Sequence, residues 1–275
     1  SRTTPSARHR VIRFRYAPKR WQQLAHASGG IVTALSRNRL LFLLLPLFLS
    51  SFLLTALWHA RKVDILHANW SINGVLAGIA GLLTGKAVIT TLRGSDVNLT
   101  KKSGLMRQMV DLCLRLSNTT VTVSPSLKEV LDQHFPQKNV EVIVNGIDQA
   151  FFTVGEQRAS VASALPGSPA SAPVRLLYVG NLTEGKGVHV ILEALKTVAT
   201  TKSWQLEIVG DGPERDKLEA QCKATKLESK VIFHGSVAPE NIPKVMARAN
   251  IFVFASFAEG RPNAVLEAMT AGLPV

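Results

Sequence analysis

The most constraining feature of this sequence is a regular alternation of short apolar runs and helix-length stretches from residue 63 to the end. Runs rich in β-branched residues are typical of buried strands, and the stretches between them favour helices. The expected strands are 63–67, 87–92, 119–123, 140–144, 174–179, 205–209, 231–235 and 251–254. This alternation predicts an α/β fold of parallel sheets covered on both faces, with ligands at the carboxyl ends of the strands.

A segment rich in Ala, Ser, Pro and Gly, residues 155–173, interrupts the alternation. It has no helical or strand period and predicts a linker. We therefore expect an N-terminal domain over 1–154 and a C-terminal domain over 174–275. The sequence has no initiating Met, and it stops where a further strand is expected, so we expect a fragment shortened at both ends.

The net charge of +13 is concentrated in residues 1–62, which contain eleven Lys and Arg and no Asp or Glu. Such a segment suits nucleic acid or anionic lipid, and the Leu- and Phe-rich run 40–58 that follows favours lipid. Pro46 near the middle of this run and basic residues at both its ends argue against a membrane span. We expect a helix that lies in the membrane interface or is buried against the first domain. The predicted location is cytoplasmic, peripheral on the inner face of the membrane, with no nucleic acid as partner.

The cysteines and carboxylates give no sign of a metal or a cofactor. Cys113 and Cys222 have no Cys or His at ligand spacing, which predicts buried free thiols. No Asp-x-Asp pair follows a strand in the second half, which argues against a metal-dependent reaction.

The stretch 257–275 is the best candidate for a reactive site. A polar turn, 258–263, joins the strand 251–254 to a helix that Asn263 is expected to cap and that Gly272 stops. The loop amides and the helix dipole then converge on one spot that suits a phosphate. The residues expected around this anion are Gly260, Arg261, Pro262, Asn263 and Ala264. Glu259 and Glu267 flank the spot, although a turn residue and a solvated helix carboxylate would give the same pair.

The string Glu-Gly-x-Pro-Asn-x-x-x-Glu-Ala-Met-x-x-Gly-x-Pro-Val at 259–275 resembles the donor-site signature of family 4 retaining nucleotide-sugar glycosyltransferases. The resemblance extends through 144–148, 178–187 and 206–213. It implies two Rossmann-like domains facing across a cleft, the GT-B architecture, both incomplete here. It also implies transfer of a sugar from a nucleoside diphosphate to an acceptor with retention at the anomeric carbon, without a cofactor or a metal.

The resemblance also implies roles for donor-side residues. Lys186, in the Gly-rich turn 180–187, and the 260–264 amides would stabilise the departing diphosphate, Glu267 would accept from the ribose, and Glu259 would hold the sugar. The remaining donor-side candidates are Gly180, Asn181 and Gly235. In the family an Arg often stands at position 181, so one positive charge is either missing here or supplied from elsewhere.

The acceptor-side candidates follow the strands of the first half: His67, Asn69, Arg93, Asp96 and Asn145. The family commonly has His-x-His and His-Gly-x-Asp at the first two of these strand ends. Asn69 takes the place of a His and cannot accept a proton at neutral pH, whereas Arg93 keeps a positive charge. The expected acceptor is a glycan or a lipid-linked precursor.

Three other functions stay open. A nucleotide-sugar epimerase of the same architecture would share the second domain but needs acid–base groups around the sugar, where Asn69 stands. A non-catalytic membrane-surface protein would explain residues 1–62 and leave 257–275 unexplained. Nucleic-acid binding would use the basic segment without the apolar run beside it.

Overall fold

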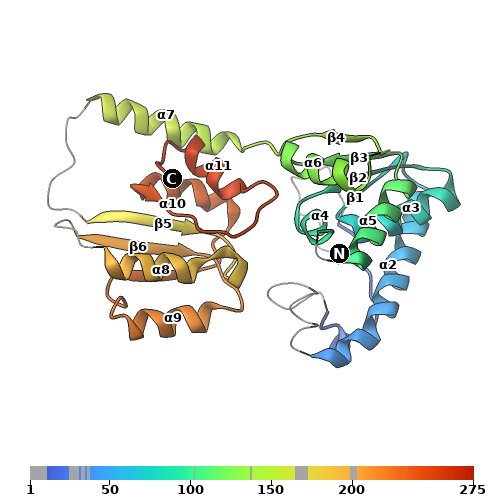
Figure 1. The fold of residues 1–275 in the computed structure, drawn as a ribbon, viewed down its shortest axis with the longest axis horizontal. Helices are drawn as coiled ribbons and strands as arrows, with labels where there is room; N and C mark the ends of the chain where they lie inside the picture. The colour runs from blue at the N-terminus through green and yellow to red at the C-terminus, as the bar shows by residue number, and fades with distance from the viewer. Residues whose placement is uncertain are drawn as a thin grey trace. The chain divides into compact units, whose positions relative to one another are not determined.

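The computed structural model of the chain consists of two units, which are described separately below. The first unit spans Ser1–Val144 and the second spans Asn145–Val275 (Figure 1). The structure describes residues 11–24, 31, 35, 38–101, 103–136, 138–164, 173–198 and 203–275.

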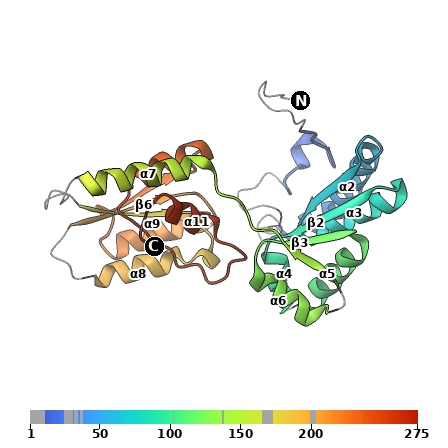
Figure 2. The same ribbon diagram turned by 90° about the horizontal axis from the view of Figure 1, so that it is seen from above.

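The first unit is built on a parallel four-stranded sheet with the order β1-β2-β3-β4 (Figure 2). The strands are β1 (Ile65–Asn69), β2 (Ala87–Leu92), β3 (Thr119–Thr122) and β4 (Val140–Val142). The α-helices are α2 (Leu45–Ala60), α3 (Ser71–Thr84), α4 (Ser95–Leu99), α5 (Gly104–Leu116) and α6 (Pro125–His134), with the 3-10 helices η1 (Lys19–Trp21) and η2 (Arg39–Leu44) before them. Leu92, Val110 and Leu131 lie at the centre of its main core, fully buried between the sheet and the helices α5 and α6.

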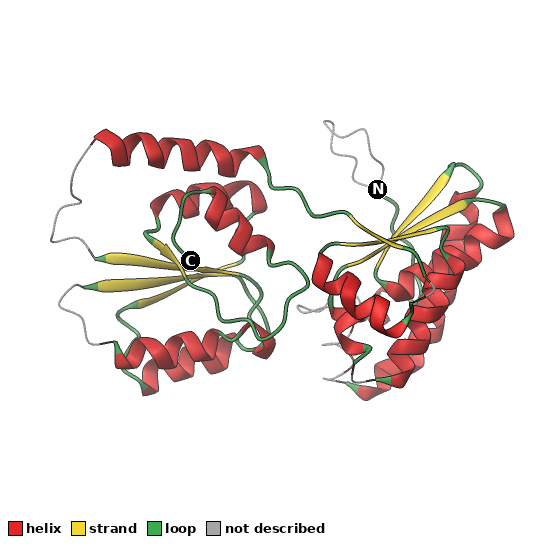
Figure 3. Cartoon of the chain, turned by 45° about the horizontal axis from the view of Figure 1, so that its top comes forward, coloured by secondary structure: helices red, strands yellow, loops and turns green. Residues whose placement is uncertain are grey.

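The second unit repeats this plan with a parallel sheet of order β7-β6-β5-β8 (Figure 3). The strands are β5 (Val174–Val179), β6 (Trp204–Val209), β7 (Val231–Gly235) and β8 (Ile251–Phe252). The α-helices are α7 (Gln149–Ala164), α8 (Val188–Thr197), α9 (Arg215–Ala224), α10 (Ile242–Arg248) and α11 (Asn263–Thr270), and the 3-10 helices are η3 (Glu184–Lys186) and η4 (Pro239–Asn241).

Both faces of this second sheet are covered. Tyr178, Leu192 and Ile208 belong to the core on the α8 and α9 side, whereas Met246 and Phe252 belong to the core on the side of α7, α10 and α11 (Figure 1). Parallel strands that are buried on both faces must be apolar throughout, which explains the continuous apolar runs in the sequence. The predicted fold class, two α/β units with parallel sheets, is confirmed.

Local chemistry sets where the helix α6 begins. The hydroxyl of Ser124 accepts a hydrogen bond from the N–H of Leu127 at 3.4 Å, and Pro125 follows in the first helical position of α6. Such a cap with Pro behind it fixes where a helix begins. The short α4, in contrast, was not predicted, and residues 11–15 form no strand.

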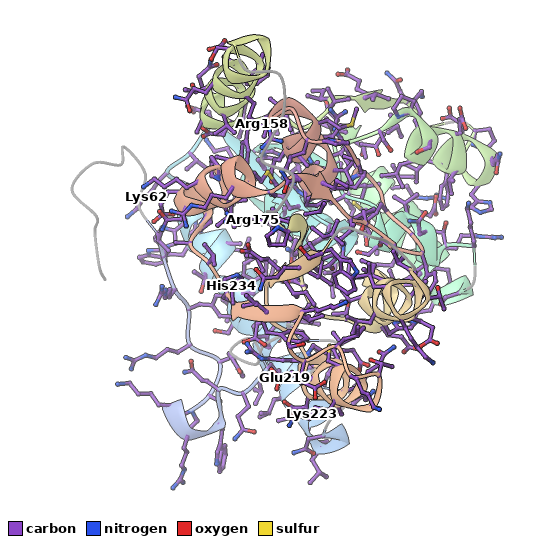
Figure 4. All side chains as sticks on the ribbon, turned by 90° about the vertical axis from the view of Figure 1, so that its left-hand side faces the viewer. Lys62, Arg158, Arg175, Glu219, Lys223 and His234 are labelled. Carbon is purple, nitrogen blue, oxygen red and sulfur yellow. The ribbon has the colours of Figure 1, made fainter. Side chains whose placement is uncertain are left out.

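The predicted linker is the main correction. Residues 155–164 are the second half of the helix α7, and the unit boundary falls after Val144 rather than after residue 154. Arg158 of α7 (Figure 4) donates to the carbonyl of Ala247 at 3.3 Å, in the last turn of α10, and to that of Ala249 at 2.8 Å, directly after the helix. Tertiary contacts of this kind stabilise a helix whose Ala- and Ser-rich sequence has no clear apolar face. The rest of the predicted linker, 165–172, lies outside the described residues.

The apolar run forms η2 and α2. Leu40–Ala60 is 21 residues long with a mean hydropathy of 2.5, and it is the one helix in the described parts of the chain that is long and apolar enough to cross a membrane. Only 6% of an 18-residue stretch of this helix is buried. One side of α2 contacts α3. The ring of Phe48 on α2 meets the ring of Phe14 at a tilt of 59° and the ring of Tyr16 edge-on, with 5.1 Å between centroids in both pairs.

Candidate functional site

The predicted catalytic pair, Lys186 and Glu259, is brought together by two loops of the second unit. Lys186 ends η3 in the loop after β5, and Glu259 lies in the loop between β8 and α11. The ammonium of Lys186 donates to the Oε1 atom of Glu259 at 2.6 Å, and both side chains are partly buried. β5 and β8 are neighbouring parallel strands, so their following loops meet at the same edge of the sheet.

Backbone contacts hold these two loops together. The carbonyl of Gly185 accepts from the N–H of Phe257 at 2.9 Å and from the hydroxyl of Ser256 at 3.2 Å. Gly187 has a φ of +67°, and a Cβ atom there would fall onto the carbonyl oxygen of Ala255. Only glycine combines this backbone conformation with so close an approach. The spacing of Lys186 and Glu259 is therefore set by the fold of both loops.

A pocket of about 690 Å³ lies at the carboxyl ends of the strands of the same unit. Three predicted donor-side residues, Gly180, Asn181 and Glu267, line it. The sequence reasoning missed three further carboxylates in its lining, Asp148, Asp211 and Glu240. Asp148 and Asp211 each had a recognisable signal, because they lie in the stretches 144–148 and 206–213 to which the resemblance extends, whereas Glu240 had none.

The charged side chains that line this pocket are all acidic, within the part of the chain that the structure describes. Burial raises the pKa of Glu267, and the nearby carboxylate of Asp148 raises it further. A raised carboxyl pKa is common at ligand sites, where it reflects groups held away from water. Because no Arg stands at position 181, the positive charge for an anionic ligand must come from elsewhere, and Lys186, which does not itself line the pocket, is the residue predicted to supply it.

The other predicted donor-side residues do not line the pocket. Gly260, Arg261, Pro262 and Ala264 form the loop and first turn of α11, and the buried Nε atom of Arg261 has no hydrogen-bond partner among the described residues. The carbonyl of Gly235 accepts from the N–H of Gly210 at 2.8 Å, so it supports the pocket floor from behind.

The predicted cap at Asn263 is wrong. Pro262 is the N-cap residue of α11 and makes no side-chain cap bond, while Asn263 is the first helical residue. The Oδ1 atom of Asn263 accepts from the side-chain amide of Asn145 at 3.0 Å. Asn145 thus belongs to the second unit and contacts a predicted donor-side residue, rather than lying with the other acceptor-side candidates.

The remaining acceptor-side candidates lie together in the first unit. Arg93 donates through Nε to the Oδ1 atom of Asn69 at 2.8 Å, and His67 is hydrogen-bonded through Nε2 to the hydroxyl of Thr91 at 2.8 Å. His67 and Asn69 also line a pocket of about 290 Å³, to which α2 contributes Phe52.

Asp96 is buried, and its carboxylate accepts from the N–H groups of Ser71 at 3.0 Å, Gly94 at 3.2 Å and Val97 at 3.1 Å. These bonds tie the starts of α3 and α4 to each other, which gives Asp96 a structural role. The acceptor contact at Asp96 stays a prediction.

Trp70, which was not predicted as a site residue, adjoins this group. Its backbone φ is +69°, which is uncommon for a large side chain, and its side chain is 49% exposed. Its N–H donates to the carbonyl of Thr91, and its own carbonyl accepts from the N–H of Gly74, both at 2.9 Å. Backbone strain held in this way is often found at functional sites.

The described residues contain no group of three or more His, Cys, Asp or Glu side chains arranged to hold a metal ion. Both cysteines are buried and free, as predicted.

Comparison with known proteins gives matches along most of the chain. The family model described as Glycosyltransferase Family 4 matches residues 2–151, more than half of the chain, and the model described as Glycosyl transferases group 1 matches residues 168–275. A similar curated protein is N-acetyl-alpha-D-glucosaminyl L-malate synthase of Bacillus anthracis, which is 25% identical over 78% of this chain and 56% of its own length.

A second relative is the UDP-Gal:alpha-D-GlcNAc-diphosphoundecaprenol alpha-1,3-galactosyltransferase of Escherichia coli, 26% identical over 78% of this chain and 57% of its own. Among solved structures, Anabaena Alr3699/HepE in complex with UDP and glucose has a TM-score of 0.67 and 22% identity, over 84% of this chain and 62% of its own. Sucrose-phosphate synthase of Thermosynechococcus elongatus also has a TM-score of 0.67, with 21% identity over 86% and 61% of the two chains.

At these identities the solved structures show the fold alone. The chain spans a little more than half of the length of the two curated relatives. The resemblance stated from the sequence is confirmed by both family models and by the GT-B fold of the structural neighbours. This chain belongs to glycosyltransferase family 4.

Proposed function

We propose that the protein transfers a sugar from a nucleoside diphosphate donor to a glycan or lipid-linked acceptor, with retention at the anomeric carbon. The observation that carries this proposal is the ion pair of Lys186 and Glu259, which two hydrogen-bonded loops hold at the carboxyl edge of the second sheet. The pocket at the same edge is lined by Glu267. Ligands of open parallel sheets bind at this edge.

The proposed roles follow the chemistry of each group. Glu267 accepts hydrogen bonds from the ribose hydroxyls, and Glu259 accepts from hydroxyls of the transferred sugar. Lys186 and the amides within 260–264 stabilise the negative charge that grows on the diphosphate. The bond between the anomeric carbon and the β-phosphate oxygen breaks with its electron pair on the phosphate. The acceptor oxygen forms the new bond on the same face, and its proton passes to the departing diphosphate, so no metal or protein nucleophile takes part.

The names of similar proteins support a nucleotide-sugar donor. The Escherichia coli relative is named for UDP-Gal, and the Anabaena structure was solved with UDP and glucose. The same relative is named for a diphosphoundecaprenol acceptor, which supports a lipid-linked acceptor in polysaccharide synthesis. An epimerase is the second candidate. Asn69 and Arg93 disfavour it, because neither side chain exchanges a proton near neutral pH.

A titration of thermal stability with UDP, GDP, ADP and their sugars tests the donor site. A ligand at a hundred times its dissociation constant stabilises the folded state by roughly 2.7 kcal/mol. We expect one nucleotide to stabilise the wild type and the control Glu193→Ala, an exposed carboxylate on α8, but not Glu267→Ala. Stabilisation of all three proteins alike would contradict the assigned site, and stabilisation of none would contradict the donor site itself. Products from an anomerically defined donor then distinguish retention from inversion and epimerisation.

We also propose that the protein is peripheral on the cytoplasmic face of the membrane. Leu43 and Leu54 are 75% and 67% exposed on η2 and α2. Among the described side chains of residues 11–62, the exposed Lys and Arg are Arg13, Arg15, Lys19, Arg20, Arg61 and Lys62. An apolar helix bordered by cations suits an anionic lipid surface. We expect salt-sensitive cosedimentation with vesicles containing phosphatidylglycerol, none with neutral vesicles, and release from native membranes by alkaline carbonate. Retention after carbonate would mean that α2 spans the membrane.

A further inference from the structure

Lys186 and Glu259, which we place at the donor, form an ion pair with each other. Lys186 is the predicted source of positive charge for the diphosphate, yet its ammonium lies 2.6 Å from the Oε1 atom of Glu259. The two side chains are 32% and 21% exposed, so water screens this pair only in part. In the ligand-free protein, the charge that should bind phosphate is neutralised by the group that should bind sugar.

Hydrogen bonds between the two loops hold this contact in place. The carbonyl of Gly185 accepts from the N–H of Phe257 and from the hydroxyl of Ser256, and these residues lie close in the chain to Lys186 and Glu259. A phosphate that approaches Lys186 therefore either displaces Glu259 or shares the ammonium with it. Displacement leaves a partly buried carboxylate without its partner, and sharing places two anions side by side.

A donor with its sugar attached removes this conflict. The hydroxyls of the sugar donate hydrogen bonds to Glu259 and replace those lost from Lys186. The bare nucleoside diphosphate has no such hydroxyls. The two ligands carry the same phosphates, so Glu259 penalises only the one that lacks the sugar.

We propose that Glu259 competes with the diphosphate for Lys186, so that the site discriminates against the bare nucleoside diphosphate and favours its release after transfer. This inference rests on the proposed function and adds to it a role for Glu259 in choosing donor over product. The ion pair between Lys186 and Glu259 re-forms when the product leaves.

Calorimetric titration with the nucleoside diphosphate that stabilises the wild type tests this role. Glu259→Gln keeps the shape of the side chain and removes its charge, and we expect it to tighten the nucleoside diphosphate about fivefold. The same variant should lose affinity for the sugar-bearing donor, or gain less, and should transfer sugar more slowly. The matched control is Glu184→Gln, which removes an exposed carboxylate from the same loop as Lys186 and should leave both affinities unchanged.

A double-mutant cycle shows whether the effect passes through the ion pair. In a Lys186→Gln background, Glu259→Gln should no longer tighten the nucleoside diphosphate. Equal tightening in both backgrounds, or in Glu184→Gln, would mean a general loss of negative charge and would overturn the proposal. Unchanged or weaker binding by Glu259→Gln would overturn it as well. Glu259→Ala provides the same readout if the Gln variant does not fold.

The outcome separates this inference from the proposed function. If a nucleoside diphosphate binds the wild type and is lost in Glu267→Ala, the donor site stands whatever Glu259 does. If no nucleotide binds any of these proteins, both the donor site and the competition at Lys186 are refuted together.

Discussion

Replacing Gly187 with Ala should uncouple the two loops that carry Lys186 and Glu259. An alanine at a φ of +67° costs about 1 kcal/mol in backbone strain. Its Cβ atom would also fall onto the carbonyl oxygen of Ala255, so the loops must separate. Separation breaks the bond from the N–H of Phe257 to the carbonyl of Gly185, which contributes about another 1 kcal/mol. Together with lost packing, the expected loss in the free energy of unfolding is about 2 to 3 kcal/mol.

Gly272→Ala is the control that shows the loss from backbone strain alone, so the difference between the two variants gives the steric part. Gly272 lies in the same unit with a φ of +73°, but no atom comes closer than 3.8 Å to its Cβ position. It should therefore lose only the backbone term, about 1 kcal/mol. Urea unfolding followed by the fluorescence of Trp204, which is buried in the second unit, measures both variants. Equal losses in the two variants would refute the reasoning, because the contact with Ala255 would then contribute nothing.

Three further predictions concern single groups. The pKa of Glu267 is raised in the folded state, so the free energy of unfolding falls as the pH rises above the ordinary carboxyl pKa. Urea unfolding should therefore show that Glu267→Gln is more stable than the wild type between about pH 4 and 7. Asn181→Arg adds a cation to a pocket lined by carboxylates and should tighten a nucleoside diphosphate roughly tenfold by calorimetry, whereas unchanged affinity would contradict the missing-charge argument. Burial raises the pKa of Cys113 and Cys222 to about 11, so a disulfide reagent should label neither thiol at pH 8 until the protein is unfolded.

Sequence reasoning predicted the strands and helices best where apolar runs and caps agree. The strand 87–92 matches the structure because its continuous run of apolar and β-branched residues is the pattern of a strand that is buried on both faces. The helix α7 was missed because nothing in its composition reveals it. Its stability comes from contacts far away in the sequence, such as those of Arg158 with the end of α10.

For the candidate site, too, the sequence predicts single residues better than the contacts between them. The motif residues Lys186 and Glu259 were predicted as separate groups, but their ion pair depends on which strands are neighbours, and the sequence order does not reveal this. Asp96 was assigned to the acceptor, although three backbone N–H groups occupy its carboxylate. Glu240 was missed because it lies in the 3-10 helix η4, which no motif marks, and Asp148 was missed although it lies in the stretch 144–148.

The floor of the large pocket has a consequence for redesign. A side chain at Gly210 would fall onto the carbonyl oxygen of Gly180, and one at Gly180 would lie 2.9 Å from the hydroxyl of Tyr178. Both positions must stay bare, so this part of the wall is main chain and offers no side chain to vary. A library intended to change which nucleotide the protein accepts should hold these two glycines fixed and place its diversity on the rim, at Asn181 and Glu240.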